Sequence, residues 1–109
     1  MTSDRELLEL AAKAAGIDLK ECPCNECGDM GYYMDGCFIE WGSLTDNDDA
    51  FRLMVKLKLL VLPSYAKQFV IVESYSKHDE VQEELGTDPE AATRRAITRA
   101  AAEFGRNMK

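Results

Sequence analysis

The chain has 109 residues, of which 46% are hydrophobic and 30% are charged, and its formal net charge is −7. These values are typical of one globular domain, and no apolar run approaches the roughly 18 residues that a membrane-spanning helix needs. We therefore expect a single domain over residues 1–109 and no membrane partner.

The charge is unevenly distributed. Residues 1–50 hold 12 acidic and 3 basic side chains, whereas residues 51–109 hold 8 and 10. A net acidic protein repels nucleic acid, so nucleic acid is an unfavourable partner unless a local basic patch overrides the average. The first ten residues, MTSDRELLEL, lack the basic and then apolar pattern of a secretion signal, and we expect a cytoplasmic protein in a host cell.

An amphipathic helix is predicted at the start of the chain. Ser3 and Glu6 form a capping box, and apolar residues then recur at helical spacing. Gly16 stands where a left-handed helix end is expected. The prediction is a helix over residues 4–15.

A loop and a hairpin follow. Residues 17–29 are predicted to form a loop that contains three of the four cysteines. Strand-forming residues lie on both sides of Asp35-Gly36, which is a strong hairpin-turn signal. Strands are therefore predicted near 30–34 and 37–41.

A second helix is predicted to end near Lys58. Thr45 and Asp48 form a second capping box, and with Asp46 and Asp49 the first turn is strongly acidic. Such a cluster could hold a divalent cation or act as a glycosidase-like carboxylate pair, but helix capping accounts for it. The apolar residues predicted to be buried are Ala50, Phe51, Met54, Val55 and Leu57.

A second hairpin is predicted after this helix. Its strands cover residues 59–62 and 68–74, separated by a turn that opens with Pro-Ser. Residues 75–87 are predicted to be a polar loop, in which Val81 and Leu85 anchor a short helical turn.

A third helix completes the predicted α+β fold. Asp88 caps this helix, Pro89 occupies its first position and Gly105 ends it. The buried stripe of this helix is predicted to contain Ala92, Ala96, Ile97, Ala100 and Phe104. Trp41, which precedes the second helix, is predicted to be a further core residue. The predicted order is αββαββα, a single domain with helices packed on an antiparallel sheet.

Three stretches together resemble one protein family. They are RELLELAAKAAGI, WGSLTDNDDAFRLMVKLKLLV and DPEAATRRAITRAAAEFGR. They are similar to an uncharacterised family of small proteins of temperate phages and prophages of Gram-negative bacteria, in which a Trp precedes PLTDDGDALRL and the last helix contains ATRRAIVRAAAE. The GSLTDNDDA turn lacks the Pro and Gly of that pattern, and the cysteine cluster is also a departure. The resemblance implies a phage or prophage accessory protein, and it implies no reaction and no catalytic residues.

The cysteine cluster is a candidate metal site. Its members are Cys22, Cys24, Cys27 and Cys37. Cys24 and Cys27 have the spacing of a zinc knuckle, and the other two cysteines, or the single histidine His78, would complete four ligands. A strong zinc ribbon has two such knuckles and this chain has one, so reduced thiols without metal remain an alternative. Disulfides are a third alternative, which a reducing cytoplasm disfavours.

A cluster of arginines on the third helix is a candidate partner-binding face. Its members are Arg94, Arg95, Arg99 and Arg106. The last three share one helical face, which would suit an acidic partner or a nucleic-acid backbone. The alternative is a solvated face that pairs with the acidic half of the same chain.

These observations favour a protein without catalytic activity. No nucleophile, base and orienting group are brought together by any motif, and His78 beside Asp79 is better explained as a solvated loop residue. The leading hypothesis is an accessory protein that binds and modulates a host protein, for example as an inhibitor of a host defence system. The acidic residues 1–50 would then occupy a basic cleft by charge mimicry. The alternative is a nucleic-acid-associated or zinc-binding regulatory protein that uses the basic face of the last helix.

Overall fold

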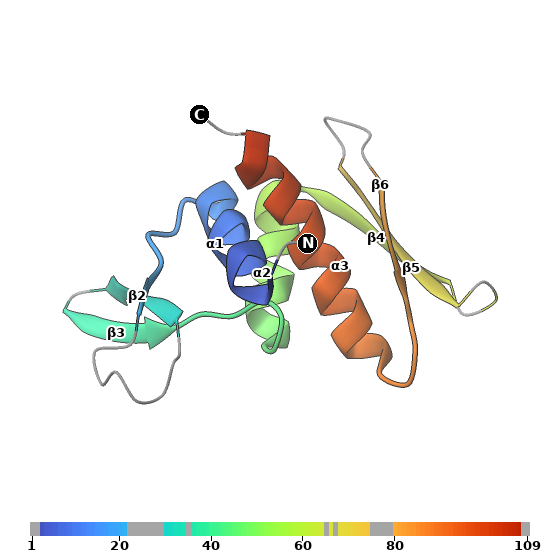
Figure 1. Cartoon of the computed structure of the whole chain (residues 1–109), viewed down its shortest axis with the longest axis horizontal. Coiled ribbons are helices and arrows are strands. Elements are labelled where there is room, and N and C mark those ends of the chain that lie inside the picture. Colours follow the sequence, from blue (N-terminus) through green and yellow to red (C-terminus); the bar gives the residue numbers. More distant parts are fainter. Residues whose placement is uncertain are drawn as a thin grey trace.

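The computed structural model describes residues 3–21, 30–34, 36–64, 66, 68–74 and 80–107. Within these residues the elements are α1 (Asp4–Ala15), β1 (Lys20–Glu21), β2 (Met30–Met34), β3 (Cys37–Glu40), α2 (Asn47–Leu57), β4 (Leu59–Ser64), β5 (Phe69–Ser74), β6 (Glu80–Glu84) and α3 (Pro89–Asn107). The strands form two antiparallel sheets, β1-β2-β3 and β4-β5-β6, which we call the distal sheet and the core sheet. The sheets lie at opposite ends of the molecule with the helices between them (Figure 1). The predicted α+β class is confirmed.

The first helix has the predicted bounds, because its end signals are local. The Ser3 hydroxyl accepts a hydrogen bond from the Glu6 amide at 3.2 Å. Gly16 adopts a left-handed conformation with φ of 76°, and its amide donates back to the last turn of α1. Glycine is favoured at this position because a Cβ would strain that backbone.

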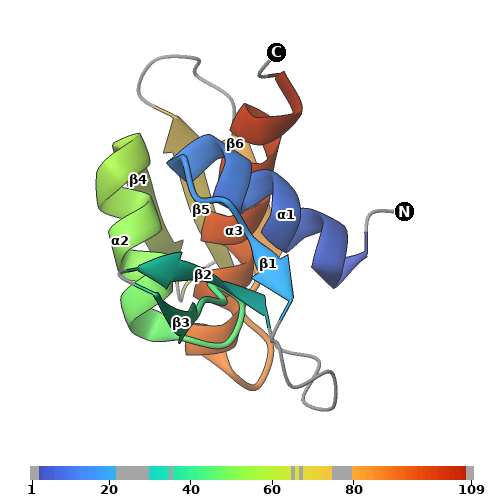
Figure 2. The ribbon, with the colours of Figure 1, turned by 90° about the vertical axis from the view of Figure 1, so that its left-hand side faces the viewer.

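α3 is the centre of the core. It packs against α1 on one side and against the core sheet on another (Figure 2). Its buried residues are Ala92, Ala96, Ile97, Thr98, Ala100, Ala101 and Ala102. Gly105 lies inside the helix and does not end it, contrary to the prediction. A Cβ at Gly105 would stand 2.0 Å from the Leu10 carbonyl oxygen, so glycine allows α1 and α3 to approach closely.

The core sheet contains a strand that the sequence did not predict. Residues 80–84 form β6, which pairs with β5 in antiparallel register, whereas a polar loop with a helical turn was predicted there. Val81 and Leu85 face the helices, and the residues between them are polar or charged. The strand was missed because most of its side chains face solvent.

The distal sheet confirms the first predicted hairpin. β2 and β3 pair from Gly31↔Glu40 to Met34↔Cys37. The two-residue strand β1, within the predicted loop 17–29, adds a third strand beside β2.

Two predictions about α2 are wrong. The N-cap is Asp46, whose carboxylate accepts from the Asp49 amide at 3.1 Å, and not Thr45. The fully buried residues of the helix are Ala50 and Leu53. Phe51 and Val55 were predicted to be buried but are 60% and 58% exposed. The apolar residues of α2 extend around more of its circumference than its neighbours cover, and the sequence pattern alone did not identify the covered side.

The segment that joins the distal sheet to α2 is anchored in the core. Trp41 is 7% exposed, as predicted for a core residue, whereas Phe104 is only partly buried. The Ser43 and Thr98 hydroxyls are both buried and lie 2.6 Å apart. Thr98 donates to the Arg94 carbonyl, so its hydroxyl accepts from Ser43. This pair ties the segment to α3.

Candidate functional site

The cysteine cluster falls mostly outside the described residues. Cys37 lies on β3 as an exposed free thiol, whereas Cys22, Cys24, Cys27 and His78 belong to the segments that the structure does not describe. The described residues contain no group of three or more His, Cys, Asp or Glu side chains that could hold a metal ion. The zinc site therefore stays a prediction.

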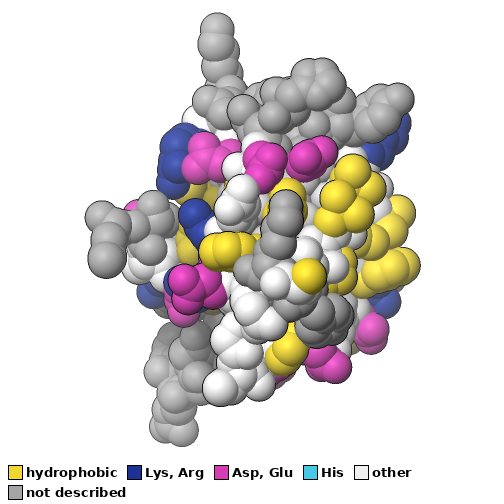
Figure 3. Space-filling view, turned by 90° about the vertical axis from the view of Figure 1, so that its right-hand side faces the viewer, with side chains coloured by type: hydrophobic (Ala, Val, Ile, Leu, Met, Phe, Trp, Pro, Cys, Tyr) yellow, Lys and Arg dark blue, Asp and Glu magenta, His cyan; other side chains and the backbone are white. Residues whose placement is uncertain are grey.

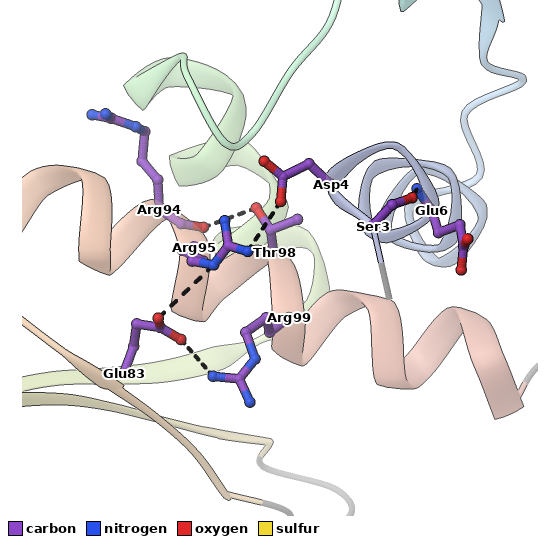
Figure 4. Close-up of polar contacts among 8 residues, drawn as sticks. All are labelled: Ser3, Asp4, Glu6, Glu83, Arg94, Arg95, Thr98 and Arg99. Atoms are coloured by element: carbon purple, nitrogen blue, oxygen red, sulfur yellow. Dashed lines mark hydrogen bonds and ion pairs between the residues drawn. The ribbon is translucent and has the colours of Figure 1, made fainter. Parts of the chain in front are cut away.

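Two arginines of α3 connect the helix to its neighbours (Figure 4). Arg95 lies 3.0 Å from the Asp4 carboxylate of α1, and its Nε lies 3.8 Å from Glu83 of β6. Arg99 also pairs with Glu83 and donates to the Gln82 carbonyl at 3.1 Å. Glu83 therefore bridges two arginines.

The other two arginines also have partners within the chain. Arg94 donates to the Leu44 carbonyl at 2.9 Å and to the Asn47 side chain at 2.6 Å, both close to the start of α2. Arg106 pairs with Glu103 on its own helix. The predicted alternative, a solvated face that pairs with the acidic half of the same chain, holds for Arg95 with Asp4, whereas Arg99 and Arg106 pair with Glu83 and Glu103 of residues 51–109. Their use by a partner stays a prediction.

The acidic first turn of α2 has a structural role. Asp46 caps the helix, and the Asp49 carboxylate accepts from the Gly42 amide at 2.9 Å. Burial raises the pKa of Asp49 above its usual value of 3.8, and the negative charge of Asp46 adds to this, while the Gly42 hydrogen bond opposes it. The capping interpretation of this cluster is supported by these contacts.

The side of the core sheet that faces away from the helices combines apolar and acidic residues, and we call it the outer face. All three helices lie on the opposite side of this sheet (Figure 1). The register aligns the outer-face residues in three rows, which are Leu60–Glu73–Glu80, Leu62–Ile71–Gln82 and Ser64–Phe69–Glu84. The apolar residues therefore lie on β4 and β5, and acidic residues border them on β5 and β6.

The apolar part of the outer face is open to solvent. Leu60 and Leu62 are 50% and 48% exposed. Phe51 and Val55 of α2 are also exposed. Phe51 lies close to β4, as shown by the groove that it lines together with Val61 of that strand. Hydrophobic side chains gather along one edge of this side of the molecule (Figure 3). Large exposed apolar residues that gather in this way mark interaction surfaces more often than isolated ones do.

The acidic part of the outer face contains an unfavourable pair. Glu73 and Glu80 are directly opposite each other on neighbouring strands, and Glu84 lies on the same side of β6. Like charges at such positions repel. Among the described residues, no basic side chain forms an ion pair with any of these three glutamates. The outer face therefore carries negative charge that the described part of the chain does not neutralise.

A groove lies beside β4, between α2 and the start of α3. Its volume is about 370 Å³, and its apolar lining residues include Phe51, Met54, Val61, Pro63 and Ile97. This volume is enough for one or two apolar side chains of a partner. The groove lies on the helix side of β4, next to the edge strand that also borders the outer face. The sequence predicted neither surface, because the outer face depends on β6 and the groove depends on how α2 packs.

Comparisons with known proteins give no further assignment. The chain matches no protein-family model, no curated protein and no solved structure. The helices within the described residues are too short or too polar to cross a membrane.

Proposed function

We propose that this protein is a phage or prophage accessory protein without catalytic activity, which binds and modulates a host protein through the outer face of the core sheet. The observation that carries the proposal is the combination of half-exposed Leu60 and Leu62 with the Glu73–Glu80 pair, which no basic side chain of the described residues neutralises. An apolar surface bordered by one sign of charge suits a partner of complementary composition. The partner surface therefore carries apolar side chains bordered by Lys or Arg. Inhibition of a host defence system is one form that such binding takes.

The energetic argument has two parts. Burying exposed apolar surface contributes about 25 cal/mol per Å² removed from water, which favours binding at Leu60 and Leu62 and, across the β4 edge, at Phe51. A lysine or arginine placed between Glu73 and Glu80 would relieve their repulsion, which adds specificity and speeds association. The groove beside β4 would receive an apolar side chain of the partner.

A second copy of the chain fits this surface less well than a basic host protein does. The net charge of −7 opposes self-association, and two copies would bring the same glutamates to one interface. Pro63 on β4, which lies at the edge of the core sheet, cannot donate a backbone hydrogen bond to an added strand.

The proposed function is tested by capture from a lysate of a Gram-negative host, followed by binding measurements with the purified partner. The test variant is Leu62→Glu on the outer face, and the matched control is Ile39→Glu on the distal sheet, where the side chain is also exposed. We expect the wild-type chain and the control to bind the same protein, and Leu62→Glu to weaken binding by roughly tenfold or more, since a charge would have to be buried. Glu80→Lys should also weaken binding.

The proposal would be overturned by equal binding of both variants. It would also be overturned if light scattering showed a dimer that Leu62→Glu disrupts, because the occupant would then be a second copy. Retention of nucleic acid, lost on Arg95→Glu with Arg99→Glu, would instead support the alternative based on α3.

A further inference from the structure

A cavity on another side of the molecule has a composition that points to a small ligand. Its volume is about 430 Å³, and it lies between α2, the end of α1 and β2. This volume is within the range of about 300–1,000 Å³ that small-molecule sites occupy. The lining side chains on which the argument depends are Tyr32, Trp41, Asp49, Arg52, Leu53 and Lys56.

One wall of this cavity is apolar and aromatic. Trp41 and Leu53 belong to the core and also line the cavity, and Tyr32 packs against the same core from β2. Tyr33 also lines the cavity, and its ring contacts Phe38 with 5.4 Å between centroids. The apolar and aromatic part of the lining therefore includes Tyr32, Tyr33, Trp41 and Leu53, and a planar ring could pack on it.

The polar part of the lining is formed by the same side of α2 that carries Leu53. Asp49, Arg52 and Lys56 follow each other at helical spacing, so they lie in a row along the cavity. With a rise of 1.5 Å per residue, the first and the last of them are about 10 Å apart along the helix axis. The row has an acceptor at one end, one cation in the middle and a second cation at the other end.

These two cations differ from the arginines of α3. No acidic side chain among the described residues forms an ion pair with Arg52 or Lys56. The Lys56 Nζ lies 3.8 Å from the position of a Cβ on Gly16, at the carboxyl end of α1, where the helix dipole partly balances its charge. Arg52 also lines the cavity, and the Asp49 carboxylate one turn earlier on α2 partly balances its charge.

We propose that this cavity binds a nucleoside monophosphate, with the base against Tyr32 and Trp41 and the phosphate at Arg52 and Lys56. Arginine and lysine side chains, which here lie one helical turn apart, bind phosphate through charge-assisted hydrogen bonds. The Asp49 carboxylate accepts from a ring N–H or amino group of the base. The length of the row of polar side chains matches a molecule that has a donor on its ring and a phosphate at its far end.

The test uses the full chain and its own fluorescence. Trp41 is the only tryptophan of the chain and lines the cavity, so its emission reports directly on occupancy. AMP, GMP, CMP and UMP are titrated one at a time, with the matching nucleosides and inorganic phosphate as controls, and calorimetry provides a second readout. We expect a saturable change with at least one monophosphate, and binding at least about tenfold weaker for its nucleoside.

The matched variants are Arg52→Gln and Arg5→Gln. Both remove one arginine charge, but Arg5 pairs with Glu9 on the surface of α1, away from the cavity lining. Arg52→Gln should weaken binding by roughly tenfold, and Arg5→Gln should leave it unchanged.

Three results would overturn the proposal. They are the absence of saturable binding at millimolar monophosphate by both readouts, equal effects of the two variants, and equal affinity for inorganic phosphate and the monophosphates. This site is separate from the outer face, so Leu62→Glu should leave nucleotide binding intact. Failure here is therefore distinguishable from failure of the proposed protein-binding function.

Discussion

The two sheets of this protein have the same simple strand order but differ in what covers them. The core sheet packs one face on α3, and Val70 and Val72 of its central strand are completely buried. In the described part of the distal sheet, the only buried residue is Gly31. The distal sheet projects from the helices at the far end of the molecule (Figure 1).

This difference separates the parts that stabilise the fold from the parts that are available for binding. α3 and the core sheet supply the core, together with α1 and the buried side of α2. The distal sheet contributes mainly through the segment after β3, where Trp41 is anchored, and through Tyr32, which forms part of a cavity wall. We therefore expect substitutions in the two regions to have unequal effects on stability.

The largest effect is expected at the anchor between the two regions. Trp41→Ala should lower the free energy of unfolding by about 3–5 kcal/mol, because it removes a buried aromatic side chain. Phe104→Ala should cost less, because Phe104 is only partly buried. Urea denaturation of both variants checks the order. Near-wild-type stability of Trp41→Ala would show that this residue is not a core anchor.

Two glycines provide a matched comparison of the regions. A Cβ would stand 2.0 Å from a backbone oxygen at Gly105, between α1 and α3, and 2.1 Å from one at Gly31, between β2 and β3. Gly105→Ala should cost about 1–3 kcal/mol or more, because the helices of the core must separate. Gly31→Ala should open the distal hairpin and cost much less in global stability. Equal losses in thermal denaturation would contradict the distinction between the regions.

A smaller effect is expected where β6 is attached to α3. Glu83 pairs with Arg95 and Arg99, and both arginine side chains are partly exposed. Glu83→Gln should lower stability by up to about 1 kcal/mol, since exposed ion pairs contribute little. The loss should shrink in high salt. A loss that does not change with salt would mean that packing, and not charge, attaches this strand.

The smallest effect is a pH dependence at the link between α2 and the segment after the distal sheet. Because the pKa of Asp49 is raised in the folded chain, its protonated form is favoured there. The contribution of Asp49 to stability is therefore present at low pH and is lost as the pH rises through the folded-state pKa. Relative to Asp49→Asn, the wild-type chain should lose stability as the pH rises from the ordinary pKa of 3.8 through the raised pKa of the folded chain. A constant difference, or a gain, would contradict the burial of this carboxylate.

The sequence predicted the elements that depend on local signals. α1 ends at Gly16 and the β2–β3 hairpin turns at Gly36 because short motifs specify these positions. β6 was not predicted, because its inward-facing residues are separated by charged ones. The buried side of α2 was predicted only in part. Ala50, Met54 and Leu57 pack in or against the core as predicted, but Phe51 and Val55 do not, because the covered side depends on how α3 and β4 pack against this helix.

The candidate surfaces could not be predicted for the same reason. The outer face depends on the register of three strands, which brings Leu60, Glu73 and Glu80 into one row. The aromatic cavity depends on the placement of β2 and α2, which line it from separate parts of the sequence. By contrast, the arginines of α3 were visible as a pattern in the sequence, but their partners Asp4 and Glu83 were not.

Amide hydrogen exchange, measured residue by residue, tests the central claim most directly. If α3 and the core sheet hold the fold, the amides of α3 and β5 should exchange only through global unfolding, with opening free energies that match the denaturation value. The amides of β2 and β3 should exchange through local opening, with clearly lower free energies. Equal protection of the β2–β3 hairpin and of β5 would contradict the account, because the distal sheet would then be part of the same cooperative core.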